Sequence, residues 1–330
     1  MITSTSEKKA FLLSIGTINI QKKIDDIPST SGPSTGEGKS LFISFDDTMV
    51  RLLIDPMSPI KGKITNNNKI KLYYDNYFLL EGFIKKIILH CPNQAYLTIS
   101  EKCIYDCKFC SVPKIGNKIK TKDEILKLLE NSVDTFHAIS LTSGVFQDPK
   151  KDIDYIIDII TSIINKYNVP IGVSIVPFDG CSSLLKKIGV LEVKYNIETF
   201  NFKMFKSICP NLNYKIIIKE LIKAVSLFGK GHVFTNLIIG LGENDNTIIK
   251  CIEYFSKHGV ITNLRPISYS KYRNSEFMKK PSKDRLIKLF KIHKNILNKY
   301  NLLNIKPLSM CSICGGCDLN PQIDEYNKNN

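Results

Sequence analysis

From Ala95 onward the chain alternates short apolar runs with longer segments of helical periodicity, and this alternation restricts its fold more than any other feature. The predicted strands are residues 95–99, 137–141, 171–176, 191–197, 232–239 and 260–265, and the predicted helices are residues 122–131, 153–167, 182–188, 215–227, 247–258 and 283–300. Six strand–helix pairs in series predict a parallel α/β sheet with crossover helices. The pattern alone fits either an open doubly wound sheet or a partial barrel.

Two regions flank the alternating part, which we place at residues 91–300. Residues 1–90 hold β-branched runs at 41–45, 49–54, 70–74 and 83–89, split by turn signals, and we predict a small, mostly β accessory region. Within it, residues 28–39 are rich in Ser, Thr, Gly and Pro, which predicts a loop or linker. Residues 301–330 form a C-terminal extension with three further cysteines.

The composition is that of an ordinary soluble globular protein, with 43% apolar and 23% charged residues in a chain of 330. It contains no apolar run of 18 residues, so we expect no membrane span. The polar start lacks an apolar signal core, and we therefore expect a cytoplasmic protein. Ten cysteines in a reducing compartment favour metal or redox use over disulfides. Four of them are scattered and are interpreted as plain buried residues: Cys91, Cys181, Cys209 and Cys251.

The formal charge of +15 has two explanations. It would attract an acidic partner, either a nucleic acid or an acidic carrier protein. It also follows from a bias toward Lys, Ile and Asn, which an AT-rich genome produces without selection for binding. No block of Lys or Arg interleaved with aromatic residues stands out along the sequence, so we expect that nucleic acid is not a partner.

Three cysteines follow the first predicted strand, namely Cys103, Cys107 and Cys110, in the spacing C-x3-C-x2-C. Three thiolates can hold three irons of a [4Fe–4S] cluster and leave the fourth iron open to a small molecule. The alternative is half of a zinc site, although zinc ligands usually come as paired C-x2-C units, and no second pair follows within about 20 residues. An open iron indicates chemistry rather than structural support.

With Phe109 directly before the third cysteine, this stretch resembles the radical S-adenosylmethionine (SAM) superfamily. The resemblance implies a partial (β/α)6 barrel of the TIM type, with a [4Fe–4S] cluster and SAM as cofactors. It also implies that SAM is cleaved reductively to a 5′-deoxyadenosyl radical, which abstracts hydrogen from a substrate. The reductant would be a protein such as ferredoxin or flavodoxin.

In such barrels the active site lies at the carboxyl ends of the strands. Thr142, Ser143 and Gly144 follow the second predicted strand, where the family has a glycine-rich motif whose backbone receives the SAM amine. The match is degenerate, and an ordinary turn is the alternative. Asn196 and Glu198 end the fourth predicted strand and resemble the segment of biotin-synthase-like members that binds the ribose hydroxyls. For these two residues the alternative is capping of the next helix.

The fifth predicted strand ends in a segment that resembles the family motif G-x-I-x-G-x-x-E, in which the backbone holds adenine. Ile238, Gly240 and Glu243 match it, and Asn236 replaces the first glycine. The alternative is a simple turn between strand and helix. Arg265 ends the sixth predicted strand and is either a carboxylate clamp for SAM or substrate, or a structural ion pair.

A second triplet, Cys311, Cys314 and Cys317, lies near the end of the chain in the spacing C-x2-C-x2-C. We predict a second, auxiliary [4Fe–4S] cluster there, serving as a sulfur donor or an electron relay. Gly315 and Gly316 between the cysteines let the backbone wrap closely around it. A zinc site that takes its fourth ligand from elsewhere in the chain, such as Cys91, is the alternative.

The motif matches narrow the resemblance to the branch with biotin synthase and lipoyl synthase. They imply sulfur insertion into a C–H bond of a small-molecule or carrier-protein-bound substrate, and the basic charge would suit an acidic carrier domain. The alternatives are radical modification of tRNA or of a protein side chain, and a non-catalytic iron–sulfur protein that transfers electrons.

Overall fold

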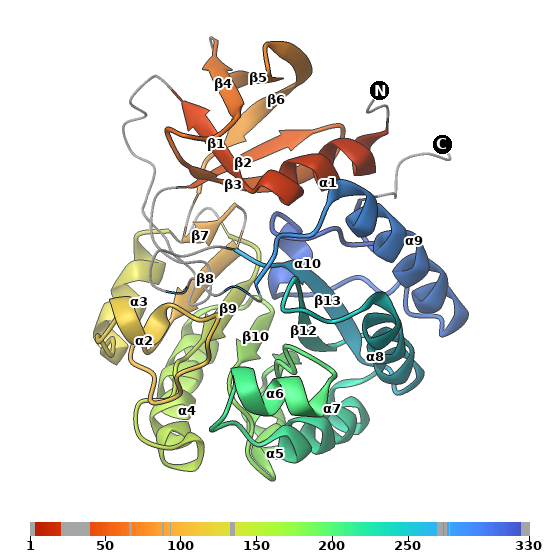
Figure 1. Cartoon of the computed structure of the whole chain (residues 1–330). Coiled ribbons are helices and arrows are strands. Elements are labelled where there is room, and N and C mark those ends of the chain that lie inside the picture. The colour runs from red at the N-terminus through yellow and green to blue at the C-terminus, as the bar shows by residue number, and fades with distance from the viewer. Residues whose placement is uncertain are drawn as a thin grey trace.

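The computed structural model describes residues 4–20, 40–65, 68–87, 89–92, 94–132, 136–268, 273, 276 and 278–324. The stretch predicted as a linker, residues 28–39, lies outside them. The described residues form a small β barrel above a larger α/β part (Figure 1). No helix in the described ranges is long and apolar enough to cross a membrane.

The small barrel is closed by six strands in the order β1-β3-β2-β6-β5-β4. These are β1 (Thr17–Ile20), β2 (Ser40–Phe45), β3 (Thr48–Ile54), β4 (Ile60–Ile64), β5 (Lys69–Tyr74) and β6 (Tyr77–Lys85). Tight turns at Asp46-Asp47 and Asp75-Asn76 join β2 to β3 and β5 to β6. All four turn residues have positive φ, which Asp and Asn tolerate better than most residues do. Helix α1 (Thr5–Ile15) precedes the barrel and begins with a capping box between Ser4 and Glu7.

The large sheet contains seven strands in sequential order, from β7 to β13. They are β7 (His90–Cys91), β8 (Gln94–Thr98), β9 (Ile139–Thr142), β10 (Ile171–Ser174), β11 (Glu192–Lys194), β12 (Val233–Ile239) and β13 (Ile261–Pro266). Strands β8 to β13 are parallel, and β7 is antiparallel to β8. A doubly wound sheet would reverse its strand order at a switch point. The unbroken order therefore decides for the partial barrel.

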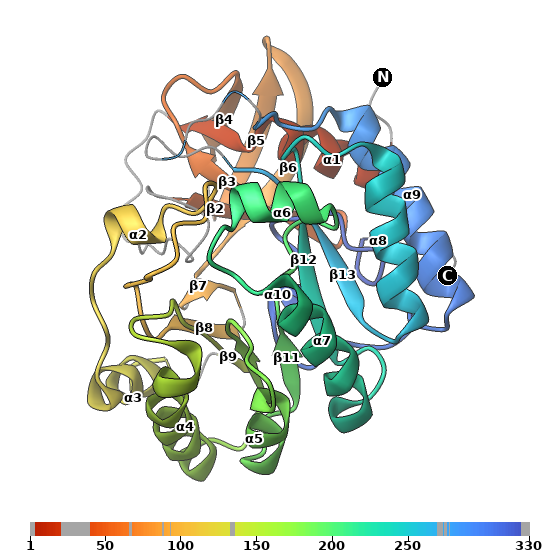
Figure 2. The same cartoon turned by 60° about the horizontal axis from the view of Figure 1, so that its bottom comes forward.

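Helices cover the outer side of the strand arc (Figure 2). They are α3 (Lys122–Glu130), α4 (Pro149–Lys166), α5 (Cys181–Lys187), α7 (Tyr214–Phe228), α8 (Asp245–Lys257) and α9 (Lys283–Lys299), and shorter helices are α2 (Val112–Ile115), α6 (Phe202–Ile208) and α10 (Cys311–Cys314). Helix α4 illustrates why they form. Asp148 caps its first turn, and Ile153, Ile156, Ile160 and Ile163 share the one face that is buried against the sheet.

Strand β11 is shorter than the predicted strand of residues 191–197, and the difference has a local cause. The Tyr195 N–H still donates to the Phe234 carbonyl of β12 at 3.0 Å. The regular ladder then breaks, because the Ile197 N–H donates to the Thr235 side-chain oxygen at 2.9 Å rather than to a backbone carbonyl. Backbone pairing resumes where the Glu198 N–H donates to the Asn236 carbonyl at 2.9 Å. The interruption leaves Asn196 and Glu198 in an irregular segment at the end of the strand.

The segment of residues 308–324 passes inside the large barrel. Three residues in register on neighbouring strands, Ser140, Gly172 and Glu192, form the layer that receives it. Glu192 accepts hydrogen bonds from the backbone N–H and the hydroxyl of Ser309, both at 2.7 Å, and the Ser140 hydroxyl accepts from the Met310 N–H at 2.8 Å. Helix α10 follows directly and lies within the arc of strands (Figure 2).

Helix α1 and the small barrel also contact the segment of residues 308–324. Lys9 of α1 is fully buried and donates to Asp324 at 2.6 Å and to the Gly315 carbonyl at 2.8 Å. The Arg51 N–H of β3 donates to the Gly316 carbonyl at 2.7 Å. The two β layers are therefore joined through the segment that carries the second cysteine triplet.

Candidate active site

The three cysteines after β8 lie on one loop and face one cavity. Cys103, Cys107 and Cys110 line it together with Phe109 and with residues at the carboxyl ends of β9, β10 and β11. Neighbouring segments fix the loop, because the Ile104 N–H donates to Val145 at 2.7 Å and the Lys108 N–H donates to Ile208 at 2.9 Å. Burial raises the pKa of Cys110 to about 12, and it also raises the pKa of Cys103. These thiols would become thiolates when a metal supplies positive charge.

Thr142, the last residue of β9, lines the same cavity together with Ser143 and Gly144, which follow the strand directly. Gly144 packs against the cysteine loop, where an added Cβ would overlap the Lys102 carbonyl oxygen and lie 3.1 Å from the Cys103 Cβ. A side chain at position 144 would therefore displace the loop. This close approach explains the glycine independently of any contact with SAM.

Asn196 and Glu198 also line this cavity. Glu198 has a φ of 60°, which is costly for a residue with a side chain, and such strain concentrates at functional sites. Burial raises the pKa of Glu198 to about 7. The structure does not use Glu198 to cap the following helix, because the N-cap of α6 is Asn201, whose side chain accepts from the Met204 N–H.

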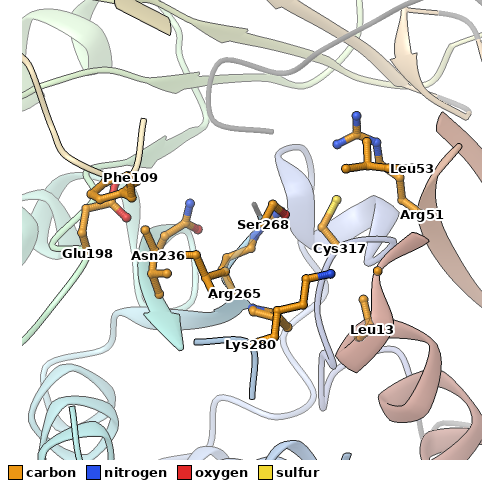
Figure 3. A pocket seen from close by; sticks show the side chains of 14 residues that line it. Leu13, Arg51, Leu53, Phe109, Glu198, Asn236, Arg265, Ser268, Lys280 and Cys317 are labelled. Carbon is orange, nitrogen blue, oxygen red and sulfur yellow. The ribbon is translucent and has the colours of Figure 1, made fainter. Parts of the chain in front are cut away.

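A second cavity adjoins the first and extends toward the small barrel. Figure 3 shows Phe109 and Glu198 at one end, Arg51 and Leu53 at the other, and Asn236, Arg265 and Cys317 between them. Ile238 lines this second cavity and not the one that holds the first cysteine triplet, and its role in binding adenine stays a prediction.

Gly240 is not among the described residues that line either cavity. Its φ of 117° requires glycine, and an added Cβ would overlap the Lys279 carbonyl oxygen. The conformation and the packing of a neighbouring chain segment are sufficient causes for this glycine. A role in binding adenine stays a prediction.

Arg265 lines both cavities and also pairs with a carboxylate of the C-terminal segment. Its Nε lies 3.3 Å from Asp318 Oδ2, and both side chains are largely buried. The ion pair expected as one alternative is therefore present. The guanidinium still faces the cavities, which leaves the clamp for SAM or substrate as a prediction.

The second cysteine triplet approaches the first through the barrel interior. Cys311 lines the cavity of the first triplet, and Cys317 lines the adjoining one. The Lys194 ammonium lies 3.3 Å from Cys311 Sγ and 3.3 Å from the Tyr96 hydroxyl, and Lys194 is only 3% exposed. Burial would raise the pKa of Cys311, but Lys194 and Arg265 outweigh it and lower that pKa to about 7.

Two cysteines that the sequence analysis interpreted as scattered core residues lie beside the triplets. Cys314 packs against the buried group that contains Cys91, and the interaction of the two thiols raises the pKa of Cys91 and lowers that of Cys314. Cys107 packs against the buried core cluster that contains Cys209, and the Cys107 thiol raises the pKa of Cys209. No spacing signal links either cysteine to its triplet, because the partners are separated by a hundred residues or more. Lys194 was also missed, although it ends β11 and lines the same cavity as Asn196 and Glu198.

The donor set fits an iron–sulfur cluster at the first triplet. Three thiols on one loop border a cavity whose other walls carry an amide, a carboxylate and a guanidinium. Among the described residues, no three His, Cys, Asp or Glu converge closely enough to hold one metal ion. Four thiolates on one zinc lie about 3.8 Å apart, given bonds of about 2.3 Å, whereas a four-iron cluster separates its ligand sulfurs more widely.

The chain thus combines a partial barrel of parallel strands with a three-cysteine loop after its first parallel strand, an arrangement in which three thiols could hold an iron–sulfur cluster. Residues 97–255 match the family model of the Radical SAM superfamily. The chain therefore carries a radical SAM domain, and the resemblance noted in the sequence is confirmed. The family implies a [4Fe–4S] cluster and SAM.

Curated relatives and solved structures agree with this assignment. The chain is 24% identical over 216 residues to lipoyl synthase of Buchnera aphidicola, covering 58% of this chain and 67% of the relative. It is 28% identical over 204 residues to biotin synthase of Methanococcus vannielii, covering 56% of this chain and 59% of the relative. The chain thus spans about three fifths to two thirds of these relatives.

Two solved structures share the fold. Methylornithine synthase superposes with a TM-score of 0.51 at 16% identity, covering 62% of each chain. A radical SAM methyltransferase from Sphaerobacter thermophilus superposes with a TM-score of 0.52 at 13% identity, covering 73% of this chain and 76% of that one. At these identities the likeness shows the fold alone, and it confirms the partial barrel.

Proposed function

We propose that this chain is a radical SAM enzyme that generates a 5′-deoxyadenosyl radical and uses it to abstract hydrogen from a substrate. One observation carries the proposal. The thiols of Cys103, Cys107 and Cys110 open onto the same cavity as Thr142, Asn196 and Glu198, which come from other strand ends. A cluster at the thiols and a nucleotide along the strand ends would therefore be neighbours.

The residues of the chain would bind and position the two cofactors. The three thiols hold irons, and the chain around Gly144 fixes the loop that carries them. Glu198 and Asn196 offer oxygen acceptors for ribose hydroxyls, and Arg265 offers donors for a carboxylate. When bound, the cluster and SAM supply one-electron cleavage of a carbon–sulfur bond. The buried strand ends limit access of water to the radical.

We further propose that the reaction inserts sulfur into a C–H bond, with an auxiliary [4Fe–4S] cluster at Cys311, Cys314 and Cys317. Cys311 lines the cavity of the first triplet, so a cluster held there would face the substrate. The similarity to lipoyl synthase and to biotin synthase supports this class of reaction.

Anaerobic reconstitution tests both parts of the proposal. With SAM and dithionite, wild-type protein is expected to form 5′-deoxyadenosine, whereas Cys107→Ala loses this activity. Cys251→Ala, a buried cysteine on α8, serves as the control and keeps it. Absence of 5′-deoxyadenosine from the iron-loaded wild type would refute the radical chemistry. Turnover without sulfur transfer to octanoylated carrier or dethiobiotin would refute sulfur insertion alone.

We also propose a protein-borne substrate, on an acidic carrier domain, and an acidic reductant such as ferredoxin or flavodoxin. The formal charge of +15 favours association with both. Association should weaken steeply as salt is raised, because exposed charges are screened beyond about 8 Å at physiological ionic strength. An association rate that does not change between low and high salt would contradict this proposal.

A second candidate function is radical modification of a nucleic acid, and one surface favours it. The solvent-facing side of β4, β5 and β6 combines lysines with aromatic rings: Lys61, Lys63, Lys69, Lys71, Lys85, Tyr73, Phe78 and Phe83. The Lys63 ammonium lies 5.2 Å from the centre of the Tyr73 ring, and Lys69 lies 5.6 Å from that of Phe83. Such faces bind single strands by stacking and charge.

The linear sequence did not show this face, because its residues alternate with buried ones along three strands. A filter-binding titration with bulk tRNA tests it. Tight retention that falls with salt, and that Phe83→Ala with Lys63→Ala weakens, would support the nucleic-acid function. Absence of retention at low salt would remove it.

A further inference from the structure

Four cysteines, not three, gather inside the large barrel. Cys91 lies on the short strand β7, the edge of the sheet, and is 2% exposed. It belongs to a buried group with Phe42, Ile87 and Tyr96, and both Cys311 and Cys314 pack against that group. The strand thus brings a fourth sulfur to a triplet more than 200 residues away in sequence.

The backbone around Cys311, Cys314 and Cys317 adopts unusual conformations and is closely packed. Met310 has a φ of 66°, an unfavourable value for a residue with a side chain, and it directly precedes Cys311. Gly315 also has a positive φ, of 60°. At Gly316 an added Cβ would lie 2.7 Å from the Phe42 ring and 3.3 Å from Cys314 Sγ. The loop therefore wraps tightly around the sulfurs, and two of its turns require glycine.

The charges around the four sulfurs are suited to an anion. Lys194 is buried, and its ammonium group contacts a thiol and a phenol, namely Cys311 Sγ and the Tyr96 hydroxyl, each at 3.3 Å. Arg265 is near Cys311 and Cys317 and pairs with Asp318. A buried cation is stable only with a compensating negative charge. A thiolate-ligated iron–sulfur cluster carries such a charge, and its reduction potential depends on nearby donors.

We propose that Cys91 is the fourth protein ligand of the second cluster, together with Cys311, Cys314 and Cys317. This inference rests on the auxiliary cluster of the proposed function and adds the ligand that closes it. With four thiolates, every iron of a [4Fe–4S] cluster is held by the chain. The second cluster thus keeps no open iron for SAM, in contrast to the first, and its Cys311 side faces the shared cavity.

The experiment isolates the second site in the full chain. A Cys103→Ala/Cys107→Ala/Cys110→Ala variant is reconstituted anaerobically, so that all bound iron belongs to the second site. Iron and sulfide content, the Mössbauer spectrum and the EPR spectrum of the reduced protein are measured. We expect about four irons per chain with the spectra of a [4Fe–4S] cluster. Cys91→Ala is then added, and Cys251→Ala on the same background is the matched control for loss of a buried thiol.

The proposal expects Cys91→Ala to lower the iron content to about three or fewer per chain, or to give a [3Fe–4S] EPR signal, while the control keeps about four. Cys91→Ser retains an oxygen ligand and should keep the cluster with a shifted EPR spectrum. This variant distinguishes lost ligation from failure to fold.

Three outcomes would overturn the proposal. If Cys91→Ala has the same iron content and spectra as the control, Cys91 is not a ligand, and the auxiliary cluster of the proposed function survives. If the starting variant binds no iron, the second cluster itself is removed. If it binds one zinc per chain and no iron, the site is a zinc site. Formation of 5′-deoxyadenosine by wild type is measured separately and depends on the first triplet alone.

Discussion

Gly172 is the position at which the barrel interior leaves least room for a side chain, and Gly172→Ala tests the path of the C-terminal segment. An added Cβ would overlap the Ser309 hydroxyl oxygen and lie 2.9 Å from the Met310 Cε and 3.1 Å from its Cγ. Overpacking of this kind costs about 1–3 kcal/mol. Rotation of the hydroxyl would break its 2.7 Å bond to the Glu192 carboxylate, which is worth about 1.5–3 kcal/mol.

We therefore expect Gly172→Ala to lower the free energy of unfolding by about 3 kcal/mol. The two costs do not add in full, because rotating the Ser309 hydroxyl away breaks its hydrogen bond but relieves much of the overpacking. The assay is urea unfolding of the anaerobically reconstituted protein, followed by circular dichroism. The iron content of the second site should fall in parallel, since Cys311 is two residues from Ser309.

A double-mutant cycle with Ser309→Ala separates the clash from a general effect of alanine on the strand. In the Ser309→Ala background the overlapping hydroxyl is gone, so Gly172→Ala should cost less than half as much as in wild type. Equal costs in the two backgrounds would refute the reasoning, because they would show that Ser309 does not press on Gly172 in solution.

Two further predictions concern buried charges. Burial raises the pKa of Glu198 from 4.5 to about 7, so the folded state binds the proton more tightly, and stability present below pH 4.5 is lost as pH rises to 7. At about 1.36 kcal/mol per pH unit, the loss of stability is about 3 kcal/mol. Glu198→Gln should avoid this loss, so its free energy of unfolding in urea should rise relative to that of wild type between pH 5 and pH 8. A difference between the two proteins that does not change with pH would contradict this prediction. Lys9→Met leaves the Asp324 carboxylate buried without its cation and should cost about 3–5 kcal/mol in the same assay. Lys219→Met, at an exposed pair with Asp179, should cost far less, and equal losses would show that the Lys9 pair is not buried in solution.

The sequence predicted the large sheet well, because each parallel strand is a buried apolar run followed by an amphipathic helix. The helix predicted at residues 122–131 is α3, which begins at Lys122 after a capping box between Thr121 and Glu124. The pattern did not decide between barrel and open sheet, since strand order depends on contacts between distant segments. In the small barrel, β4 was missed because its outward lysines obscure the alternation of Ile60, Gly62 and Ile64.

The candidate site was predicted where a motif is local. Cys103, Cys107 and Cys110 share a loop, so their spacing along the chain reflects their spacing in space. Lys194 could not be found in this way, and Cys91 was named only as an alternative zinc ligand, because β7 and β11 meet the C-terminal segment through contacts between distant parts of the chain. Long-range placement of this kind is a property of packing rather than of local sequence.

The passage of residues 308–324 through the barrel interior constrains the order of folding. The strands that surround this segment are synthesised first. The layer at Ser140, Gly172 and Glu192 lacks its packing partners, Ser309 and Met310, until the segment enters the barrel. Contacts as distant as Lys9 with Asp324 make such assembly slow. The interior of the large barrel therefore cannot be fully packed until residues 308–324 have been synthesised and have entered it.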